Sequence, residues 1–475
     1  MATHVLRHFC KNRAAIDLGN FKTIPKPKVC QRTFTSALFV TGDQAHKTFA
    51  YLTPEIDFND RINNLQKLQY DIDSRGLEIN AEELSKKWHH YQYIISNKNS
   101  LQQKLTSLTN KVVELKKIDS PSSEEEQQIE ALITQCKLVK QDLKTVKEAA
   151  WEIEKTVIPE ILKVPNEVDE DTPSQSSTVI KSVGKIPEDH KCEWKSHLDI
   201  GKRLDLLDYR NPVHFFLCNE AAVFELGVLA MASKIMSEYS FYRVSGPDFC
   251  RSVVVEGSGM DHESSSETFI LKNTDNVEQS YLINRLHLVG GASLPALLAQ
   301  QTKTVSRRKF FPVKMFTSGR QYTPFPKTSA TYGLFTVCQA SALQALAYIV
   351  DNNGESCSKE FENLVNITSR IYDNIGCHYR IVLKCAKELE ISERKRVSFE
   401  MWSAYSKQYV EVGHVSACGD YFSKRLLIGC QSTEKMEFPS TITGTLLSVP
   451  RVLGCMLEEN PEEFLLPDTV AKSWL

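Results

Sequence analysis

Residues Ile129–Val157 read IEALITQCKLVKQDLKTVKEAAWEIEKTV, and this stretch decides the fold of the N-terminal region. Its apolar residues recur at alternating spacings of three and four. The seam positions are Ile129, Leu132, Cys136, Val139, Leu143, Val146, Ala150, Ile153 and Val157. A narrow stripe with this period is typical of a coiled coil and not of an ordinary surface helix.

An upstream stretch has a similar seam, so we expect two helices to pair. Its apolar positions are Leu84, Trp88, Tyr91, Ile95, Leu101, Leu105, Leu108, Val112 and Leu115. Between the two stretches, Asp119–Ser123 contains Pro121 and precedes three glutamates, which suits a turn and a helix N-terminus. We therefore predict an antiparallel coiled-coil hairpin over about residues 82–161, with arms roughly 54 Å long at 1.5 Å per residue.

The composition is that of an ordinary globular chain. It has 475 residues and a formal net charge of −2. No apolar run approaches the length of about 18 residues that a membrane span needs, so none is expected. The 13 cysteines are dispersed without C-x-x-C pairs or metal-ligand spacing. We expect reduced cysteines, no metal and no cofactor.

Residues 1–40 differ from the rest of the chain in charge, with a single acidic residue, Asp17. The basic residues are Arg7, Lys11, Arg13, Lys22, Lys26, Lys28 and Arg32. A basic segment without an unbroken apolar core is typical of an organelle transit peptide, so we predict import into the mitochondrial matrix. The alternative is a basic tail without a targeting role.

Three segments follow. Residues 41–165 hold the hairpin, and Pro165 ends it because proline disfavours helix at the residue before it. Residues 166–190 are acidic and then rich in Ser, Thr and Pro, so we expect a linker with one short strand at Thr178–Ser182. Residues 191–475 have the mixed pattern of a globular domain.

This C-terminal domain is expected to mix helices and strands without regular βαβ alternation. Helices are predicted at Asn219–Glu238 and Leu447–Glu459. Strands are predicted at Phe241–Val244, Thr268–Leu271, Phe311–Phe316 and Tyr409–Val415. The order favours an α+β fold with a largely antiparallel sheet flanked by helices.

The helix predicted at Asn219–Glu238 is apolar on more than one face, as at Leu226, Leu229 and Met231. A helix of this kind needs cover on two sides, and one domain core covers only one. We therefore predict a dimer interface at about residues 219–250. The alternative is a helix buried wholly within its own domain.

Several short motifs resemble those of seryl-tRNA synthetases in order and spacing, over about residues 58–470. They are His197-Leu198-Asp199-Ile200-Gly201, Leu206-Leu207-Asp208-Tyr209, Glu256-Gly257-Ser258-Gly259, Gly333-Leu334, Glu400-Met401-Trp402, Arg451 and Leu466-Pro467-Asp468. Within that family, the chain most resembles the catalytically degenerate members of insect mitochondria. The resemblance implies a class II catalytic fold, a dimer formed through the helix and strand before Gly246-Pro247, and an arm that grips tRNA(Ser).

The chain departs from the family at the charged positions that would hold ATP and serine. The family's second motif has the form Phe-Arg-x-Glu, and this chain has Phe316-Thr317-Ser318-Gly319 there. Gly291-Ala292-Ser293 stands in place of the Thr-x-Glu that recognises serine. Further charged or polar positions correspond to Thr336, Cys338 and Ala417. Such charges hold phosphate and carboxylate oxygens, so the departures imply lost catalysis, with no catalytic residue assigned.

Two arginines bear on this interpretation. A shifted alignment would place Arg320 at the position of Thr317. Arg451 corresponds to the arginine of the family's third motif, although Pro450 replaces a glycine beside it. Arg451 is either a remnant of a nucleotide site or, as we favour, a structural residue bonded to neighbouring carbonyls. Pro450 costs about 3 kcal/mol inside a helix unless the helix begins there.

Lysines of the predicted hairpin are the candidate RNA-binding residues. On the second helix, Lys137, Lys140, Lys144 and Lys147 each follow a seam position by one residue. Lys104 and Lys111 form a seven-residue pair on the first helix. Such a stripe can follow phosphates. The alternative is a solvated coiled-coil flank that pairs with acidic residues.

Three functions remain open. The first is a non-catalytic mitochondrial paralogue that binds RNA, with tRNA(Ser) as a candidate, and dimerises with itself or with the active mitochondrial seryl-tRNA synthetase. The second is a working synthetase with a rebuilt site. The third is a protein-interaction scaffold that binds no RNA. The missing charges favour the first over the second, and the lysine stripe separates the first from the third only weakly.

Overall fold

The computed structural model describes residues 36–39, 52–56, 58–117, 122–186, 195–271, 285–325, 332–351, 354–432 and 436–474. Residues 1–35 of the predicted transit peptide and residues 118–121 of the predicted turn lie outside the described residues. No helix in the described ranges combines the length and apolar character needed to cross a membrane.

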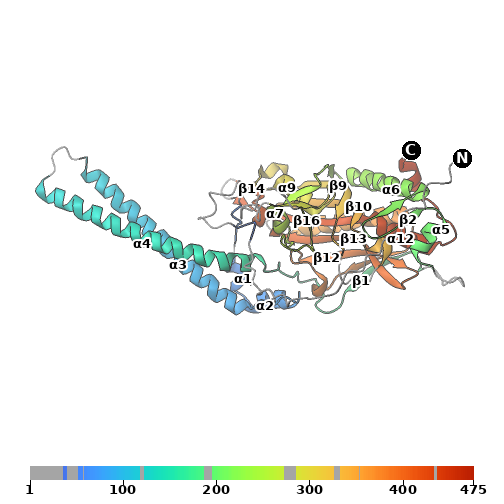
Figure 1. Ribbon diagram of the computed structural model, residues 1–475, viewed down its shortest axis with the longest axis horizontal. Coiled ribbons are helices and arrows are strands. Elements are labelled where there is room, and N and C mark those ends of the chain that lie inside the picture. Colours follow the sequence, from blue (N-terminus) through green and yellow to red (C-terminus); the bar gives the residue numbers. More distant parts are fainter. Residues whose placement is uncertain are drawn as a thin grey trace, which may run out of the picture. The chain divides into compact units, whose positions relative to one another are not determined.

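Two long helices form the arm (Figure 1). They are α3, Ala81–Leu115, and α4, Ser123–Leu162, which lie antiparallel along each other. A capping box begins α4, because the Ser122 hydroxyl accepts from the Glu125 N–H and the Glu125 carboxylate accepts from the Ser122 N–H. Val139, Leu143, Ala150 and Val157 are buried as seam residues. The sequence period therefore predicted both helices and the face that each turns to its partner.

The base of the arm packs into the rest of the fold. The short helices α1, Asn59–Ile62, and α2, Leu65–Asp73, precede the arm. Leu84, Trp88 and Val157 share a hydrophobic cluster with Tyr421 and Phe422 of the C-terminal domain. After the arm, the Asn166 side-chain amide donates to the carbonyls of Ser392 and Cys418, at 2.9 and 2.7 Å. The arm is thus fixed to the domain by both apolar packing and hydrogen bonds.

An eight-stranded sheet forms the centre of the C-terminal domain, in the order β1-β11-β12-β13-β16-β10-β9-β4. Its strands are β1 Thr178–Val183, β11 Tyr379–Leu383, β12 Lys395–Ser403, β13 Gln408–Gly419, β16 Ser440–Ser448, β10 Gln339–Ile349, β9 Val313–Tyr322 and β4 Tyr242–Arg243. Every neighbouring pair is antiparallel except β4 with β9. The predicted α+β fold with a largely antiparallel sheet is confirmed.

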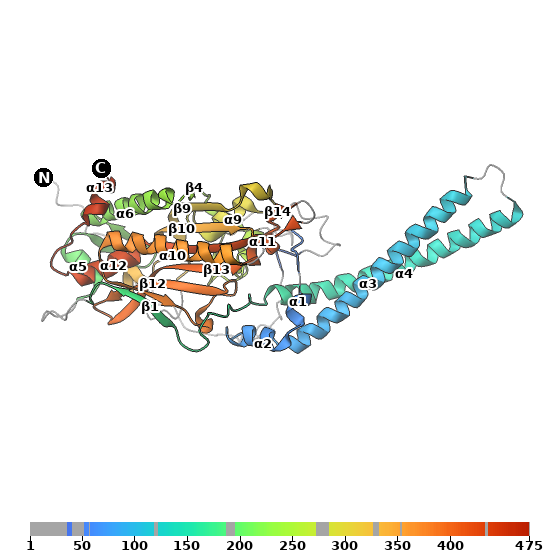
Figure 2. The ribbon, with the colours of Figure 1, turned by 180° about the vertical axis from the view of Figure 1, so that it is seen from behind.

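Helices cover both faces of this sheet. On one face lie α5 His197–Arg203, α6 Asn219–Glu238, α10 Glu355–Ile375, α12 Val449–Glu459 and α13 Asp468–Trp474. Figure 2 shows α10 lying lengthwise along the sheet on this face. On the other face, α7 Ser252–Gly257, α9 Leu294–Gln301 and α11 Tyr421–Leu426 pack together with the arm base. Because side chains alternate along a strand, neighbouring residues of β9 and β10 enter different cores.

The described residues of the domain also form three smaller sheets. They are β5 Phe249–Arg251 with β7 Leu286–Leu288 and β6 Phe269–Leu271; β2 Leu207–Tyr209 with β3 Phe215–Leu217; and β8 Val305–Arg307 with β14 Gly429–Gln431 and β15 Met436–Glu437. The 3₁₀ helices are η2 Arg308–Phe310, η3 Gly333–Phe335 and η4 Ala386–Glu388.

Two predicted boundaries change. The segment predicted as a linker contains β1, close to the short strand expected there at Thr178–Ser182, and its pairing with β11 makes this part of the segment an edge strand of the main sheet. Ser36, Ala37 and Leu38 are buried although they fall within the stretch 1–40 predicted as a transit peptide. Burial of a segment depends on residues far away in the chain, which local composition does not report.

Candidate functional site

A cleft of about 540 Å³ lies where the resemblance places the reaction site. It opens on the sheet face opposite α6, and β9, β10, β13 and β16 contribute its floor. Among the described residues, no group of three His, Cys, Asp or Glu side chains is arranged to hold a metal ion.

Two residues at the substituted positions are bonded to the local backbone. The buried Thr317 hydroxyl donates to the Gly291 carbonyl at 3.0 Å. The buried Ser293 hydroxyl donates to the Gly290 carbonyl at 2.7 Å and accepts from the N–H of Ala296, which caps α9. A hydroxyl engaged in this way is a structural group, and neither residue carries a charge toward the cleft.

Arg320 lies on the opposite face of the sheet from the cleft. Its guanidinium pairs with Glu225 of α6 at 3.2 Å. Its neighbour Gln321 faces the cleft, where the side-chain amide donates to the Ala292 carbonyl at 2.6 Å. Successive side chains of a strand point to opposite faces of the sheet. In this register Arg320 therefore cannot take the place in the cleft that a shifted alignment would give it.

Neutral side chains fill the floor beside Gln321. Its amide also approaches the Gln344 side-chain oxygen at 3.3 Å and the Thr445 hydroxyl at 3.2 Å. Gln344 in turn donates to the Thr443 hydroxyl at 2.9 Å and accepts from Thr445 at 2.8 Å. These amides and hydroxyls satisfy one another.

One guanidinium in the cleft is neutralised by neighbouring carboxylates. Arg396 of β12 pairs with Glu411 of β13 and lies 3.5 Å from a Glu393 oxygen. Glu411 also accepts from Ser398 at 2.7 Å and lies 3.4 Å from the His414 ring. Burial alone would raise the pKa of Glu411, but Arg396, His414 and Ser398 together hold it well below its usual range. The positive charge of Arg396 is therefore committed to the protein itself.

Arg451 lines the same cleft and is bonded to carbonyls. Its Nε donates to Phe335 O at 3.2 Å, and its Nη1 donates to Glu411 O at 3.0 Å. Pro450 occupies the first turn of α12, which begins at Val449, so the proline starts the helix and does not break it. Arg451 thus has the contacts with neighbouring carbonyls that we expect of a structural arginine.

The candidate RNA-binding lysines of the arm are all exposed, and the structure pairs none of the six with a carboxylate among the residues it describes. They are Lys104, Lys111, Lys137, Lys140, Lys144 and Lys147. Lysines nearer the base behave differently, since Lys86 pairs with Glu82 at 2.8 Å and Lys87 with Glu160 at 2.9 Å. The stripe therefore lacks the acidic partners that a salt-bridged flank would have.

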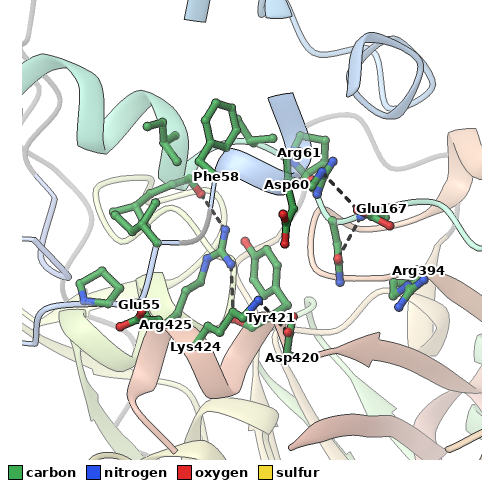
Figure 3. A pocket seen from close by; sticks show the side chains of 17 residues that line it. Glu55, Phe58, Asp60, Arg61, Glu167, Arg394, Asp420, Tyr421, Lys424 and Arg425 are labelled. Carbon is green, nitrogen blue, oxygen red and sulfur yellow. Dashed lines mark hydrogen bonds and ion pairs between the residues drawn. The ribbon is translucent and has the colours of Figure 1, made fainter. Parts of the chain in front are cut away.

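A second pocket, of about 260 Å³, lies at the arm base (Figure 3). Arg61 pairs there with Asp71 at 2.9 Å and with Glu167 at 3.6 Å. The Arg425 guanidinium lies 3.4 Å from the centre of the Tyr421 ring. The same guanidinium donates from Nη2 to the Leu162 carbonyl at the end of α4, at 3.4 Å, so Arg425 joins the arm to α11 of the domain.

Sequence reasoning missed the bonding within the cleft and the role of Glu256. Arg396 and Glu411 sit on neighbouring strands whose pairing the sequence does not specify. Glu256 belongs to the short motif Glu256-Gly257-Ser258-Gly259, and in the structure its carboxylate accepts hydrogen bonds from residues 36–38. Its one available signal was an acidic residue directly after the apolar run Val253–Val255.

Comparisons with known proteins agree with this geometry. Residues 285–460 match the tRNA synthetase class II core domain (G, H, P, S and T). The chain is 27% identical over 440 residues to the serine–tRNA synthetase-like protein Slimp of Drosophila melanogaster, which spans 91% of this chain and 90% of that protein. It is 23% identical to the mitochondrial serine–tRNA ligase of Mus musculus, over 73% of this chain and 67% of that protein.

A solved structure shows the same fold. The seryl-tRNA synthetase from Pyrococcus horikoshii complexed with ATP matches with a TM-score of 0.72 and 18% identity, over 88% of this chain and 98% of that chain. The resemblance to seryl-tRNA synthetases and the class II synthetase fold are confirmed.

Proposed function

We propose that this chain, with its class II synthetase fold and its resemblance to seryl-tRNA synthetases, is a non-catalytic mitochondrial paralogue of them. It binds RNA through its arm and a second synthetase-like subunit through α6. One observation carries the proposal: Thr317, Gln321 and Arg396 are bonded to other groups of the protein, whereas the arm lysines lack carboxylate partners within the described residues.

The contacts in the cleft support the loss of catalysis. Adenylate formation needs fixed positive charge around the phosphates of ATP and a polar group for serine. The guanidiniums nearest the cleft floor, Arg396 and Arg451, are held by Glu411, Glu393 and backbone carbonyls. A working synthetase with a rebuilt site would need these groups to exchange their partners for the substrate.

The arm supports RNA binding over a scaffold without RNA. Six exposed lysines without carboxylate partners in the described arm leave their charge available to phosphates, and mitochondrial RNA such as tRNA(Ser) is the proposed ligand. A scaffold that contacts only protein would not need that charge. The lysines lie off the seam, so their charge is separable from the stability of the hairpin.

The proposed dimer surface is the outer face of α6. Phe224, Val228 and Ala232 are buried in the domain core. A second side is covered by α13, whose Val470 lies 2.8 Å from the position of a Cβ added at Gly227. Leu226 stays 48% exposed on the remaining side. Its partner is a second copy of this chain or the active mitochondrial seryl-tRNA synthetase, and we favour the second.

We expect Leu226→Asp to abolish binding of the partner subunit and to leave RNA binding unchanged. Tagged chain recovered from mitochondria should bring down both RNA and a synthetase-like subunit, identified by sequencing and by mass spectrometry. The aspartate places a charge in the interface, twice over in a two-fold dimer, so the subunit should be lost while RNA remains. Val305→Asp, at a residue 55% exposed on β8, is the matched control. Recovery of neither RNA nor a second subunit with the unaltered chain would contradict the proposal.

The mitochondrial location rests on the basic segment at residues 1–40 and on a relative named as mitochondrial. We place the protein in the matrix, where mitochondrial tRNA and its synthetase would be available to it.

A further inference from the structure

The described residues begin at Ser36, four positions after Arg32, the last basic residue of the predicted transit peptide. Ser36, Ala37 and Leu38 are 4%, 1% and 0% exposed. Leu38 belongs to the hydrophobic cluster that also contains Val253 and Val255 of α7. A segment so deeply buried is a structural part of the protein and not a disposable extension.

Glu256 of α7 holds this segment by its carboxylate. Its Oε1 accepts from the Ser36 hydroxyl at 2.8 Å. Its Oε2 accepts from the N–H groups of Ala37 and Leu38, at 2.5 and 2.8 Å. The Ser36 hydroxyl also accepts from the Phe39 N–H at 3.0 Å, which closes the segment into a turn around the carboxylate.

The carboxylate needs these donors. Glu256 is 8% exposed, and burial raises its pKa, while the nearby His262 and the donors from residues 36–38 oppose that rise. A buried carboxylate without hydrogen bonds is strongly unfavourable, so removal of the segment would leave Glu256 with only His262 of the partners named here. The segment and the glutamate therefore stabilise each other.

We propose that Ser36–Phe39 is an N-terminal anchor that the mature chain retains on Glu256, and that leader removal therefore cuts a peptide bond on the N-terminal side of Ser36. A processing endopeptidase adds water across that bond, which leaves a carboxylate on the released leader and an ammonium group on the mature chain. Cleavage beyond Ser36 would remove the donors that Glu256 requires. The location of this cleavage rests on the proposed mitochondrial function, whereas the anchor itself does not.

Import into isolated mitochondria, followed by N-terminal sequencing, tests the cleavage. We expect the imported chain to be shortened and to begin no later than Ser36. A mature chain that begins at residue 37 or later would overturn the proposal. Replacement of Arg7, Arg13 and Arg32 by glutamate should abolish import. If the unaltered chain is not imported, the proposed mitochondrial location is wrong. The anchor is then tested by the experiments on purified protein.

Two truncated chains test the anchor in purified protein. A chain that begins at Ser36 should melt at the temperature of the full chain, and one that begins at Thr41 should melt at least about 5 °C lower. Equal melting temperatures for the two truncated chains would overturn the anchor.

A double-mutant cycle separates anchoring from a general structural role of Glu256. Glu256→Ala should lower the melting temperature of the chain that begins at Ser36, yet have much less effect in the chain that begins at Thr41, since the contact is already gone. Glu362→Ala, at an exposed residue of α10, is the control and should not change the melting temperature of either truncated chain. Equal effects of Glu256→Ala in both chains would show that Glu256 does not act through the segment.

Discussion

Serine-dependent exchange of pyrophosphate into ATP is expected to be at least about 10⁴-fold slower in this protein than in a seryl-tRNA synthetase. Loss of one preorganised donor typically costs about a hundred- to a thousand-fold in rate. Thr317, Gly319 and Ser293 together replace several such groups, so simple addition would give roughly a million-fold. Coupled residues are not additive, which is why we expect only the smaller loss.

The contacts in the cleft make compensation from nearby residues difficult. Arg320 pairs with Glu225 on the far face of the sheet, and Arg396 pairs with Glu411. The exchange assay needs a working seryl-tRNA synthetase as its positive control, with the same serine and ATP concentrations. Exchange within about a hundred-fold of that control would contradict the prediction, because a single lost donor already costs that much.

Alanine at Lys137, Lys140, Lys144 and Lys147 together is expected to weaken binding of structured RNA by about a hundred-fold near 0.1 M salt. Each lysine that neutralises a phosphate contributes about 0.7 to 0.9 unit to the log–log salt dependence. The slope should therefore flatten by up to about 3 units. Fluorescence anisotropy across a salt series measures both quantities.

Arginine at the same four positions is the matched control. It keeps the charge and should keep both the affinity and the slope within a few-fold. Circular dichroism should show unchanged helix content in both variants, because all four lysines are exposed and lie beside the seam. Unchanged RNA affinity in the alanine variant would assign the arm to another ligand.

The elements that sequence predicted best are those with a strong local signal. The arm follows from a seam that repeats over many turns, and α6 spans the predicted Asn219–Glu238. The helix predicted at Leu447–Glu459 is α12, which begins two residues later, at Val449, because the proline next to it suits a helix N-terminus. Strand β9 runs to Tyr322, well beyond the predicted Phe316, because its pairing with β10 extends it.

Some missed features were accessible to the same reasoning. Helix α10 carries Phe361, Leu364, Ile371 and Ile375 on one buried face, and glycines with positive φ stand at both of its ends. That pattern of apolar spacing between two glycines indicates a helix of about this length. Its absence from the predicted elements was an omission and not a limit of the sequence.

Other features depend on contacts that no local pattern contains. Ser36 and Glu256 are 220 positions apart in the chain. The face of Arg320 depends on the register of β9 against β10, and a shift of one residue would turn it into the cleft. The resemblance located the substituted positions of the candidate site, but only the fold shows that their replacements bond to the backbone.

We expect that the cleft does not bind a seryl adenylate. Isothermal titration calorimetry with a non-hydrolysable seryl-adenylate analogue, in which a sulfamoyl group replaces the phosphoryl group, tests this binding directly and requires no catalytic turnover. An active synthetase should bind such an intermediate analogue at micromolar concentration or tighter. The contacts of Thr317, Ser293 and Arg396 predict no binding of this protein up to about 1 mM analogue, and a dissociation constant below about 100 µM would contradict the claim.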